Sequence, residues 1–168
     1  MPKGIIILGS SRSKGETFQL CEYIHRKTGY PIIDLKSKHI SEYNYDNQYP
    51  ENDAHSAIMK DIAENYDQII FASPVYWYSM SGIMKTFFDR ITDCLVHDKD
   101  TGRKLRGKSM AALSCSAPDL IDGFYMPYRE TALYLGMNYL GDVHGYIENG
   151  KINTEVQDKL DKFINKLH

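Results

Sequence analysis

Cysteine is scarce in this sequence, and long apolar runs are missing. Cys21, Cys94 and Cys115 are the only cysteines among 168 residues, and no pair of them has the spacing of a metal site or a disulfide framework. The apolar run near the N-terminus, Gly4 to Leu8, is too short for a signal peptide or a membrane span. We therefore expect a protein of the reducing cytoplasm with no membrane partner and no metal.

An excess of positive charge is also missing. The formal net charge is −2, and no basic face is visible, which argues against a nucleic acid as the main partner. The apolar fraction of 42% and the charged fraction of 25% are those of an ordinary globular protein. The length, with no repeat or linker, predicts one domain over residues 1–168.

Two common phosphate-binding motifs are absent. A Walker A loop needs four residues between its glycines followed by lysine, but Gly9 and Gly15 enclose five, and Glu16 stands where lysine should be. The dinucleotide fingerprint G-x-G-x-x-G is missing as well. These absences argue against a nucleoside triphosphatase and against a Rossmann dinucleotide site.

What is present is a regular alternation of short apolar runs and amphipathic segments. Several of the expected strands are apolar throughout, which is typical of a parallel sheet covered on both faces. The expected strands are 3–8, 31–35, 67–72, 108–114 and 139–146, and the expected helices are 17–28, 57–64, 83–95, 123–135 and 154–167. The fold class is therefore α/β, and ligands are expected at the carboxyl ends of the strands, in loops 9–16, 73–82 and 114–122.

The first loop, "GSSRSKGET", combines small hydroxyl residues with the beginning of a helix. Backbone N–H groups at a helix N-terminus attract anions, and an arginine fork suits phosphate oxygens. We expect a monophosphate here, and the alternative is a polar turn with a good helix cap. The candidate donors are Ser10, Ser11, Arg12, Ser13 and Thr17.

The second loop contains three consecutive aromatic residues, including the only tryptophan. Such rings can line a flat heteroaromatic ligand, or they can cover the helix below or a subunit interface. The candidates are Pro74, Val75, Tyr76, Trp77 and Tyr78.

The stretches "GSSRSKGET" (9–17) and "SPVYWYSMSGIMKTFFDR" (73–90) together resemble the NAD(P)H-dependent FMN reductase family of the flavodoxin-like superfamily. The resemblance implies a three-layer α/β/α sandwich with a five-stranded parallel sheet in the order 2-1-3-4-5. It implies a homodimeric flavoprotein that binds FMN non-covalently, with the phosphate in the first loop, including Gly15 and Glu16, and the isoalloxazine bordered by residues 74–78. A hydride from NADPH or NADH would pass through FMN to a small-molecule acceptor such as a quinone, nitro compound, azo dye or free flavin.

The third loop would lie beside the flavin ring in this arrangement. Backbone N–H groups of Ser114, Cys115 and Ser116 could then stabilise negative charge on the reduced flavin. Cys115 has no partner at C-x-x-C spacing, so we interpret it as a small buried residue rather than a redox thiol.

The sequence departs from the family in one place and excludes one family variant. Glu16 occupies a position where the family usually has a small polar residue such as asparagine. The sequence therefore lacks, at this position, the side chain that would donate to the phosphate. Because there is no cysteine between Cys21 and Cys94, we expect no iron–sulfur cluster. The alternative function is a flavodoxin-type electron-transfer protein without NAD(P)H oxidase activity, and a third is a scaffold that has lost its cofactor.

Other polar and aromatic residues have ordinary interpretations. We expect His144 to be packed or hydrogen-bonded rather than to act as a base, and no catalytic side chain is predicted. A hairpin-like turn at 100–102 would place Arg103, Lys104 and Arg106 in a solvated flap, or beside the 2′-phosphate of NADPH. The long segment 36–53 has no clean period, and its tyrosines 43, 45 and 49 could cap the flavin pocket of a dimer partner or pack within the loop.

Overall fold

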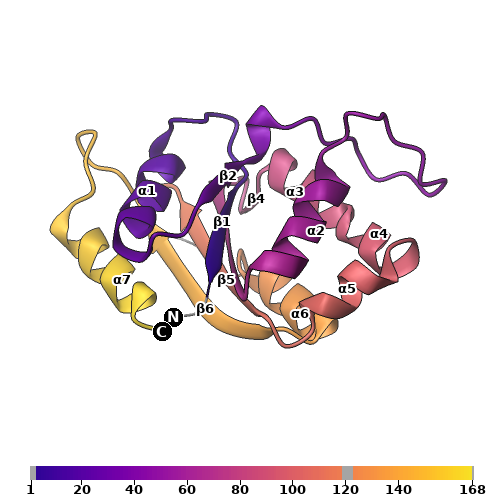
Figure 1. Cartoon of the computed structure of the whole chain (residues 1–168). Coiled ribbons are helices and arrows are strands. Elements are labelled where there is room, and N and C mark those ends of the chain that lie inside the picture. Colours follow the sequence, from indigo (N-terminus) through magenta and orange to yellow (C-terminus); the bar gives the residue numbers. More distant parts are fainter. Residues whose placement is uncertain (1–2, 119–122, 168) are drawn as a thin grey trace.

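Five parallel strands form the sheet of this computed structural model, which describes residues 3–118 and 123–167. Their order is β2-β1-β3-β5-β6, which confirms the predicted order 2-1-3-4-5 of the flavodoxin-like fold (Figure 1). A sixth, two-residue strand, β4, pairs antiparallel with the far end of β3 and was not predicted. The strands are β1 (Gly4–Leu8), β2 (Ile32–Asp34), β3 (Gln68–Tyr76), β4 (Ser79–Met80), β5 (Ser109–Cys115) and β6 (Asn138–Gly145).

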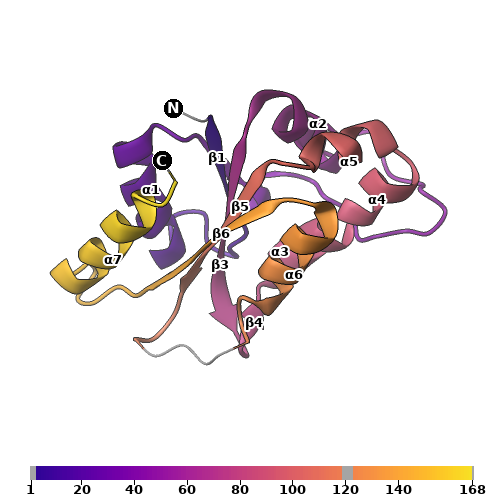
Figure 2. The same ribbon diagram turned by 90° about the horizontal axis from the view of Figure 1, so that it is seen from below.

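Helices cover both faces of the sheet, so the predicted three-layer sandwich is confirmed (Figures 1 and 2). One face is covered by α1 (Glu16–Thr28) and α7 (Thr154–Ile164). The other face is covered by α2 (His55–Asn65), α3 (Gly82–Asp89), α4 (Ile91–Val96), α5 (Lys99–Leu105) and α6 (Met126–Leu135). Within the described ranges, none of these helices has the length and apolarity that a membrane span requires.

The alternation of side chains along each central strand explains why the sheet has two buried faces. Successive side chains of a strand point to opposite faces; in β1, Ile6 and Leu8 pack toward α1 and α7, whereas Ile5 and Ile7 pack toward the opposite layer. All five residues of β1 are buried. A strand that is apolar at every position therefore belongs in the middle of this sheet, as its sequence predicts.

Three local features differ from the sequence expectations. The helix expected over 83–95 is two helices, because the chain bends at Arg90, which ends α3 and precedes α4. The hairpin-like turn expected at 100–102 is wrong: these residues lie in α5, whose first turn is capped by the Asp98 carboxylate accepting from the Thr101 N–H. The last helix is capped by Asn153, not by Thr154, with the Asn153 side chain accepting from the Val156 N–H at 2.9 Å.

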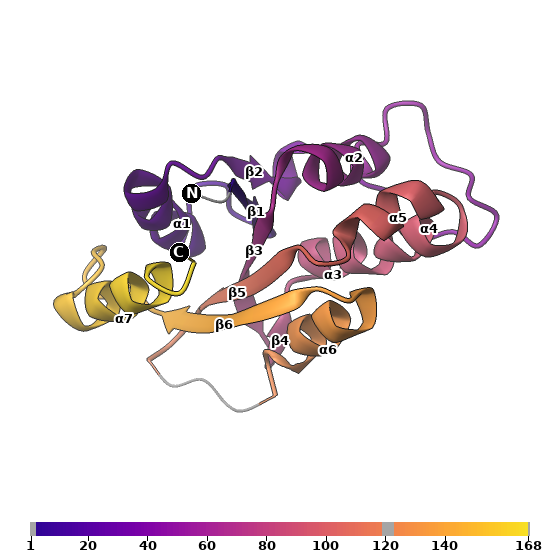
Figure 3. The same ribbon diagram turned by 60° about the horizontal axis from the view of Figure 1, so that its bottom comes forward.

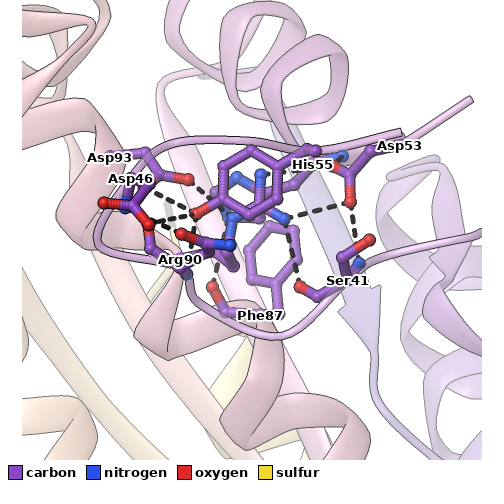
Figure 4. A network of polar contacts seen from close by, with 9 residues as sticks. Ser41, Asp46, Asp53, His55, Phe87, Arg90 and Asp93 are labelled. Carbon is purple, nitrogen blue, oxygen red and sulfur yellow. Dashed lines mark hydrogen bonds and ion pairs between the residues drawn. The ribbon is translucent and has the colours of Figure 1, made fainter. Parts of the chain in front are cut away.

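A buried arginine holds the long connection 38–54, which has almost no secondary structure of its own (Figure 4). The Arg90 side chain is 2% exposed and donates to both Asp53 carboxylate oxygens at 3.0 and 3.2 Å and to Asp93 at 2.6 Å. The same guanidinium donates to the Ser41 carbonyl, and the Tyr49 ring lies over it at 3.3 Å from the guanidinium carbon. The connection is therefore fixed by tertiary contacts rather than by local periodicity. For Tyr49 the structure shows packing within the loop.

Candidate functional site

A small pocket at the carboxyl edge of the sheet joins the three loops that the sequence singled out. Its volume is about 140 Å³, and it lies where β1 and β3 are neighbours and the chain order reverses, the usual ligand site of such sheets. The residues that line it are Ser10, Arg12, Glu16, Thr17, Pro74, Val75, Tyr76, Cys115 and Ser116. Six predicted residues do not line it: Ser11, Ser13, Gly15, Trp77, Tyr78 and Ser114.

The floor of the pocket is the turn between β1 and α1. Gly15 is the N-cap of α1 and supplies no side-chain cap, so the first-turn N–H groups of the helix keep their capacity to bind an anion. Ser10 is buried, and its hydroxyl accepts from the Arg12 N–H at 3.2 Å. A Cβ at Gly15 would lie 3.1 Å from the Arg12 Cβ, so glycine suits this tight turn. The floor has the donor set expected for a phosphate monoester.

Glu16 is the one lining residue that conflicts with a bound phosphate. It is exposed, it belongs to the first turn of α1, and it lines the pocket together with Arg12 and Thr17. An acidic residue in a first turn stabilises its own helix through the helix dipole. The same carboxylate repels an anion at that N-terminus, so Glu16 improves the helix and weakens the anion site.

The second wall of the pocket consists of Pro74, Val75 and Tyr76. These residues belong to β3, which pairs with β4 in a hairpin; Figure 3 shows where the two strands lie in the fold. The Tyr76 hydroxyl lies 2.6 Å from the Ser11 hydroxyl and so joins this wall to the first loop. At the base of the hairpin, Ser81 donates from its hydroxyl to the Gly9 carbonyl at 2.6 Å and accepts from the Met84 N–H at 3.1 Å. Ser81 thus fixes the hairpin to both the first loop and α3.

Gly9 and Ser81 support the pocket, although neither is among the site residues that the sequence predicts. A Cβ on Gly9 would come within 2.8 Å of the Met84 Cβ, so only glycine allows α3 to pass this close to the end of β1. For Ser81 a signal existed, since serine before an amphipathic helix is a typical N-cap. Its second bond, to a carbonyl 72 residues away in the chain, has no local signal.

The three adjacent aromatic residues do not all line the pocket. Tyr76 lines the pocket, whereas Trp77 and Tyr78 form the two-residue turn of the hairpin and are 92% and 65% exposed. Both turn residues have positive φ angles, 49° and 64°. The rings of Trp77 and Tyr78 therefore stand beyond the pocket, in solvent.

The third loop contributes Cys115 and Ser116 to the pocket but keeps Ser114 out of it. The Ser114 hydroxyl is buried and lies 2.7 Å from His144 Nδ1, beside the Tyr125 hydroxyl. His144 Nε2 lies 2.8 Å from the Ala117 carbonyl; because a carbonyl only accepts, Nε2 donates, and in the neutral ring Nδ1 accepts from Ser114. This confirms the hydrogen-bonded interpretation of His144, which fixes the loop after β5.

Two further expectations about the third loop concern its backbone N–H donors and the thiol of Cys115. The Ser116 N–H donates to the Gly145 carbonyl at 3.3 Å, so this one of the three expected backbone donors is engaged within the sheet. Burial raises the pKa of the Cys115 thiol to about 12, which keeps it protonated and unreactive at neutral pH and fits its interpretation as a small buried residue. The loop was expected to extend to Asp122, and its residues 119–122 lie outside the described residues.

The basic residues considered for NADPH lie far from the pocket. Arg103 and Lys104 belong to α5, which ends shortly before β5 begins, whereas Cys115 of the pocket ends β5. Seven strand residues at about 3.3 Å each separate the two ends by roughly 20 Å. Arg103 instead pairs with Asp100 in solvent. Tyr43 and Tyr45 make an edge contact on the surface, at a centroid distance of 5.0 Å.

Comparisons with known proteins place the chain among flavin reductases. The family model "NADPH-dependent FMN reductase" matches residues 2–151. An uncharacterized NAD(P)H oxidoreductase, YdeQ, of Bacillus subtilis (strain 168) is 26% identical over 111 residues, which are 59% of this chain and 56% of that protein. An FMN-dependent NADPH-azoreductase of Staphylococcus aureus (strain USA300) is 33% identical over 97 residues, 53% of this chain and 52% of that protein. The chain thus spans only about half the length of these curated relatives.

A solved structure agrees in fold over the whole chain. General stress protein 14 of Treponema denticola, crystallised in complex with FMN, superposes with a TM-score of 0.67 at 17% identity and covers 99% of this chain and 100% of its own. At this identity the likeness supports the fold alone. The family match over residues 2–151, with the sheet order and pocket position described above, shows that this chain belongs to the NADPH-dependent FMN reductase family.

Proposed function

We propose that this protein is an FMN-dependent NAD(P)H oxidoreductase built as one flavodoxin-like domain. The observation that carries the proposal is the pocket at the carboxyl edge, where an uncapped helix N-terminus meets Ser10, Arg12 and Thr17. These groups fit a phosphate monoester, and the pocket is smaller than those that enclose a whole cofactor. It suits the phosphate end of FMN, with the flavin ring toward Tyr76.

The residues around the pocket would bind and orient rather than transfer protons. Arg12 and the N–H groups of the α1 first turn hold the phosphate, Pro74, Val75 and Tyr76 border the ring, and Cys115 and Ser116 close the third side. The chemistry that bound FMN would supply is acceptance of a hydride from NAD(P)H and delivery of its two electrons and its proton, together with one further proton from solvent, to the acceptor. We infer a quinone, nitro, azo or flavin acceptor, and no side-chain acid or base is required.

A homodimer is part of the proposal. A groove of about 600 Å³ runs between α4 and α6, and Ile91, Leu95 and Leu133 contribute to its largely apolar lining. Leu133 and Tyr134 project from the same face with 63% and 78% of their surfaces exposed. A groove beside a projecting apolar ridge suits a two-fold contact between copies of the chain.

The test is a spectroscopic titration of the purified protein. We expect added FMN to bind, with its fluorescence quenched, and the yellow flavin absorption to bleach on anaerobic addition of NADPH or NADH. Arg12→Ala should weaken FMN binding by roughly tenfold or more, because it removes a charge-assisted phosphate contact. The matched control Arg103→Ala removes the same charge at the other end of β5 and should leave FMN binding unchanged.

The competing functions give different outcomes in the same titration. A flavodoxin-type electron carrier binds FMN, but neither reduced nicotinamide bleaches it. A scaffold without a cofactor neither binds FMN nor turns yellow. Light scattering on the FMN-loaded protein measures the proposed dimer.

A further inference from the structure

Lys36 is an exposed residue outside the pocket, yet its side chain ends on the first loop. Its ammonium donates to the Ser11 carbonyl at 2.5 Å, although the two residues are 25 positions apart in the chain. Within residues 3–118 and 123–167, no other donor reaches the Ser11 carbonyl. The conformation of the first loop therefore depends on a lysine that does not itself line the pocket.

The backbone around Lys36 is held in place by its neighbours. The Asp34 carboxylate accepts from the Lys36 N–H at 3.0 Å and caps a one-turn 3₁₀ helix, η1 (Leu35–Ser37). The Leu35 side chain is buried, and the Ser37 hydroxyl donates to the Asp34 carbonyl at 2.7 Å. The side chain of Lys36 therefore starts from a fixed point just beyond the end of β2.

The order of the strands explains how Lys36 reaches the first loop. The two neighbours of β1 in the sheet are β2 and β3 (Figure 3), and Leu8 at the end of β1 is in register with Asp34 of β2. Lys36 contacts Ser11 from the side of β2. Tyr76 contacts it from the side of β3, with 2.6 Å between the two hydroxyl oxygens. Ser11 is thus held from both neighbouring strands.

The lysine contact orients the peptide unit that precedes Arg12. In a trans peptide the carbonyl and the following N–H point in opposite directions. Here the Ser11 carbonyl accepts from Lys36, and the Arg12 N–H donates to the Ser10 hydroxyl at 3.2 Å. The Arg12 side chain then passes close to the start of α1, since a Cβ on Gly15 would lie 3.4 Å from the Arg12 Nε. The orientation of this peptide unit therefore sets the point from which the guanidinium reaches the pocket.

We propose that Lys36 is a positioning residue for FMN: by holding the Ser11 carbonyl, it keeps Arg12 where it can bind the phosphate. This role rests on the proposed function, which places the phosphate of FMN at the start of α1. A loop that is ordered in advance loses less conformational entropy when its ligand binds. Riboflavin has no phosphate for Arg12 to bind, so Lys36 also determines how strongly the protein prefers FMN to riboflavin.

The test compares two flavins on the full chain freed of bound flavin. Fluorescence quenching measures the Kd for FMN and for riboflavin in about 0.15 M salt, where the Debye length is about 8 Å. Lys36→Met should raise the Kd for FMN roughly three- to tenfold, as expected for loss of one hydrogen bond, and should leave the Kd for riboflavin within about twofold. Lys36→Arg keeps a charged donor and should stay within about twofold of the wild type for both flavins.

A double-mutant cycle tests whether Lys36 acts through Arg12. In the Arg12→Ala background, Lys36→Met should raise the Kd for FMN by less than about twofold, because the residue that Lys36 positions is gone. Lys36→Gln, which lacks both the charge and the reach of lysine, should behave like Lys36→Met in the otherwise wild-type protein. Both single variants change the surface alone, so their Tm should stay within about 2 °C of the wild type.

The matched control is Lys38→Met, which removes the same charge two residues further along. Lys38 is exposed, and in the part of the chain that the structure describes its side chain forms no hydrogen bond or ion pair. This variant should change the Kd for neither flavin. An increase equal to that in Lys36→Met would show a general effect of positive charge near β2 and would overturn the positioning role.

The remaining outcomes separate the role of Lys36 from the proposed function. If the wild-type protein fails to bind FMN or to oxidise NAD(P)H, the proposed function is wrong. If it does both, but Lys36→Met keeps the wild-type Kd for FMN, the positioning role is wrong and the function stands. Equal increases in the Kd for FMN and for riboflavin, or a full increase in the Arg12→Ala background, would also overturn it, because Lys36 would then act on the whole fold or independently of Arg12.

Discussion

Single residues at the pocket decide how well it can hold an anion, and Glu16 is the clearest case. The turn before α1 offers Ser10, Arg12 and Thr17 as donors, yet Glu16 lines the same pocket with a negative charge. The sequence raises this conflict by itself, because the resemblance implies a small polar residue at this position. The structure adds that Glu16 lines the pocket beside Arg12 and Thr17.

Removing that charge should strengthen cofactor binding. We expect Glu16→Gln to lower the Kd for FMN roughly five- to twentyfold at low ionic strength, because two like charges about 4 Å apart in water repel by roughly 1 kcal/mol and a phosphate ester carries up to two charges. The gain should shrink as salt is added, since exposed charges are screened. Fluorescence titration of FMN at low and high salt measures both effects.

The matched control for this variant lies on the same helix. Glu22→Gln removes an equal charge from a partly exposed residue that pairs with Arg26, and it should leave the FMN Kd unchanged. An unchanged or larger Kd in Glu16→Gln would mean that the phosphate binds elsewhere than at the start of α1.

At the scale of elements, the sequence predicts regular structure well and long-range anchoring poorly. The apolar runs of β1, β3 and β5 identify buried strands because both faces of a central strand are covered by helices, so most of its positions are apolar. The break between α3 and α4 has no such signal, since the apolar spacing continues from Ile83 through Ile91 across it. Arg90 stands at the break, and its partner Asp53 lies 37 residues away in the chain.

The candidate site shows the same division between local and non-local signals. Loop composition correctly predicts that Arg12, Tyr76 and Cys115 lie at one pocket, because the carboxyl ends of parallel strands lie at the same edge of the sheet. The turn at Trp77 and Tyr78 could not be predicted, because sequence preference disfavours those residues at positive φ. Sequence reasoning thus fails where tertiary structure overrides a local preference.

The Arg90 cluster gives a prediction about how the long connection 38–54 is held. Arg90→Met should lower the free energy of unfolding by about 3 to 5 kcal/mol, because it leaves the carboxylates of Asp53 and Asp93 buried without their partner. Denaturant unfolding measures the loss. Arg129→Met serves as the control, since Arg129 pairs with Glu130 in solvent and an exposed pair contributes at most about 1 kcal/mol. Equal stability of the two variants would show that the cluster does not anchor the connection.

At the scale of the whole molecule, the same cluster links stability to pH through His55. This residue begins α2, is 1% exposed and lies with Nε2 at 3.2 Å from the Phe87 carbonyl of α3. Desolvation by burial, followed by the nearby positive charge of Arg90, lowers the pKa of His55 to about 4 from its usual value near 6.5. The folded protein therefore keeps this imidazole neutral, with Nε2–H donating to the carbonyl.

The sign of the pH dependence follows from the protonation of His55 in the folded protein and in the unfolded chain. Below about pH 6.5 the unfolded chain protonates His55 and the folded protein does not, so the free energy of unfolding falls as the pH falls. The loss approaches about 1.4 kcal/mol per pH unit and ends near pH 4. Asp53 affects the free energy of unfolding at a lower pH than His55 does. Burial alone would raise the pKa of Asp53, but hydrogen bonds from Arg90 and from backbone N–H groups lower this pKa to about 2. Its stabilisation is therefore lost only below about pH 3.8.

The last prediction isolates the contribution of His55 from that of every other titrating group. His55→Gln keeps an N–H that can reach the Phe87 carbonyl and carries no titratable ring. We expect its unfolding free energy to fall less steeply than that of the wild type between pH 6.5 and 4.5, so that a deficit at pH 7.5 shrinks or reverses at pH 4.5. Urea unfolding at several pH values in this window measures the difference, and parallel curves for the two proteins would show that His55 titrates alike in the folded and unfolded states.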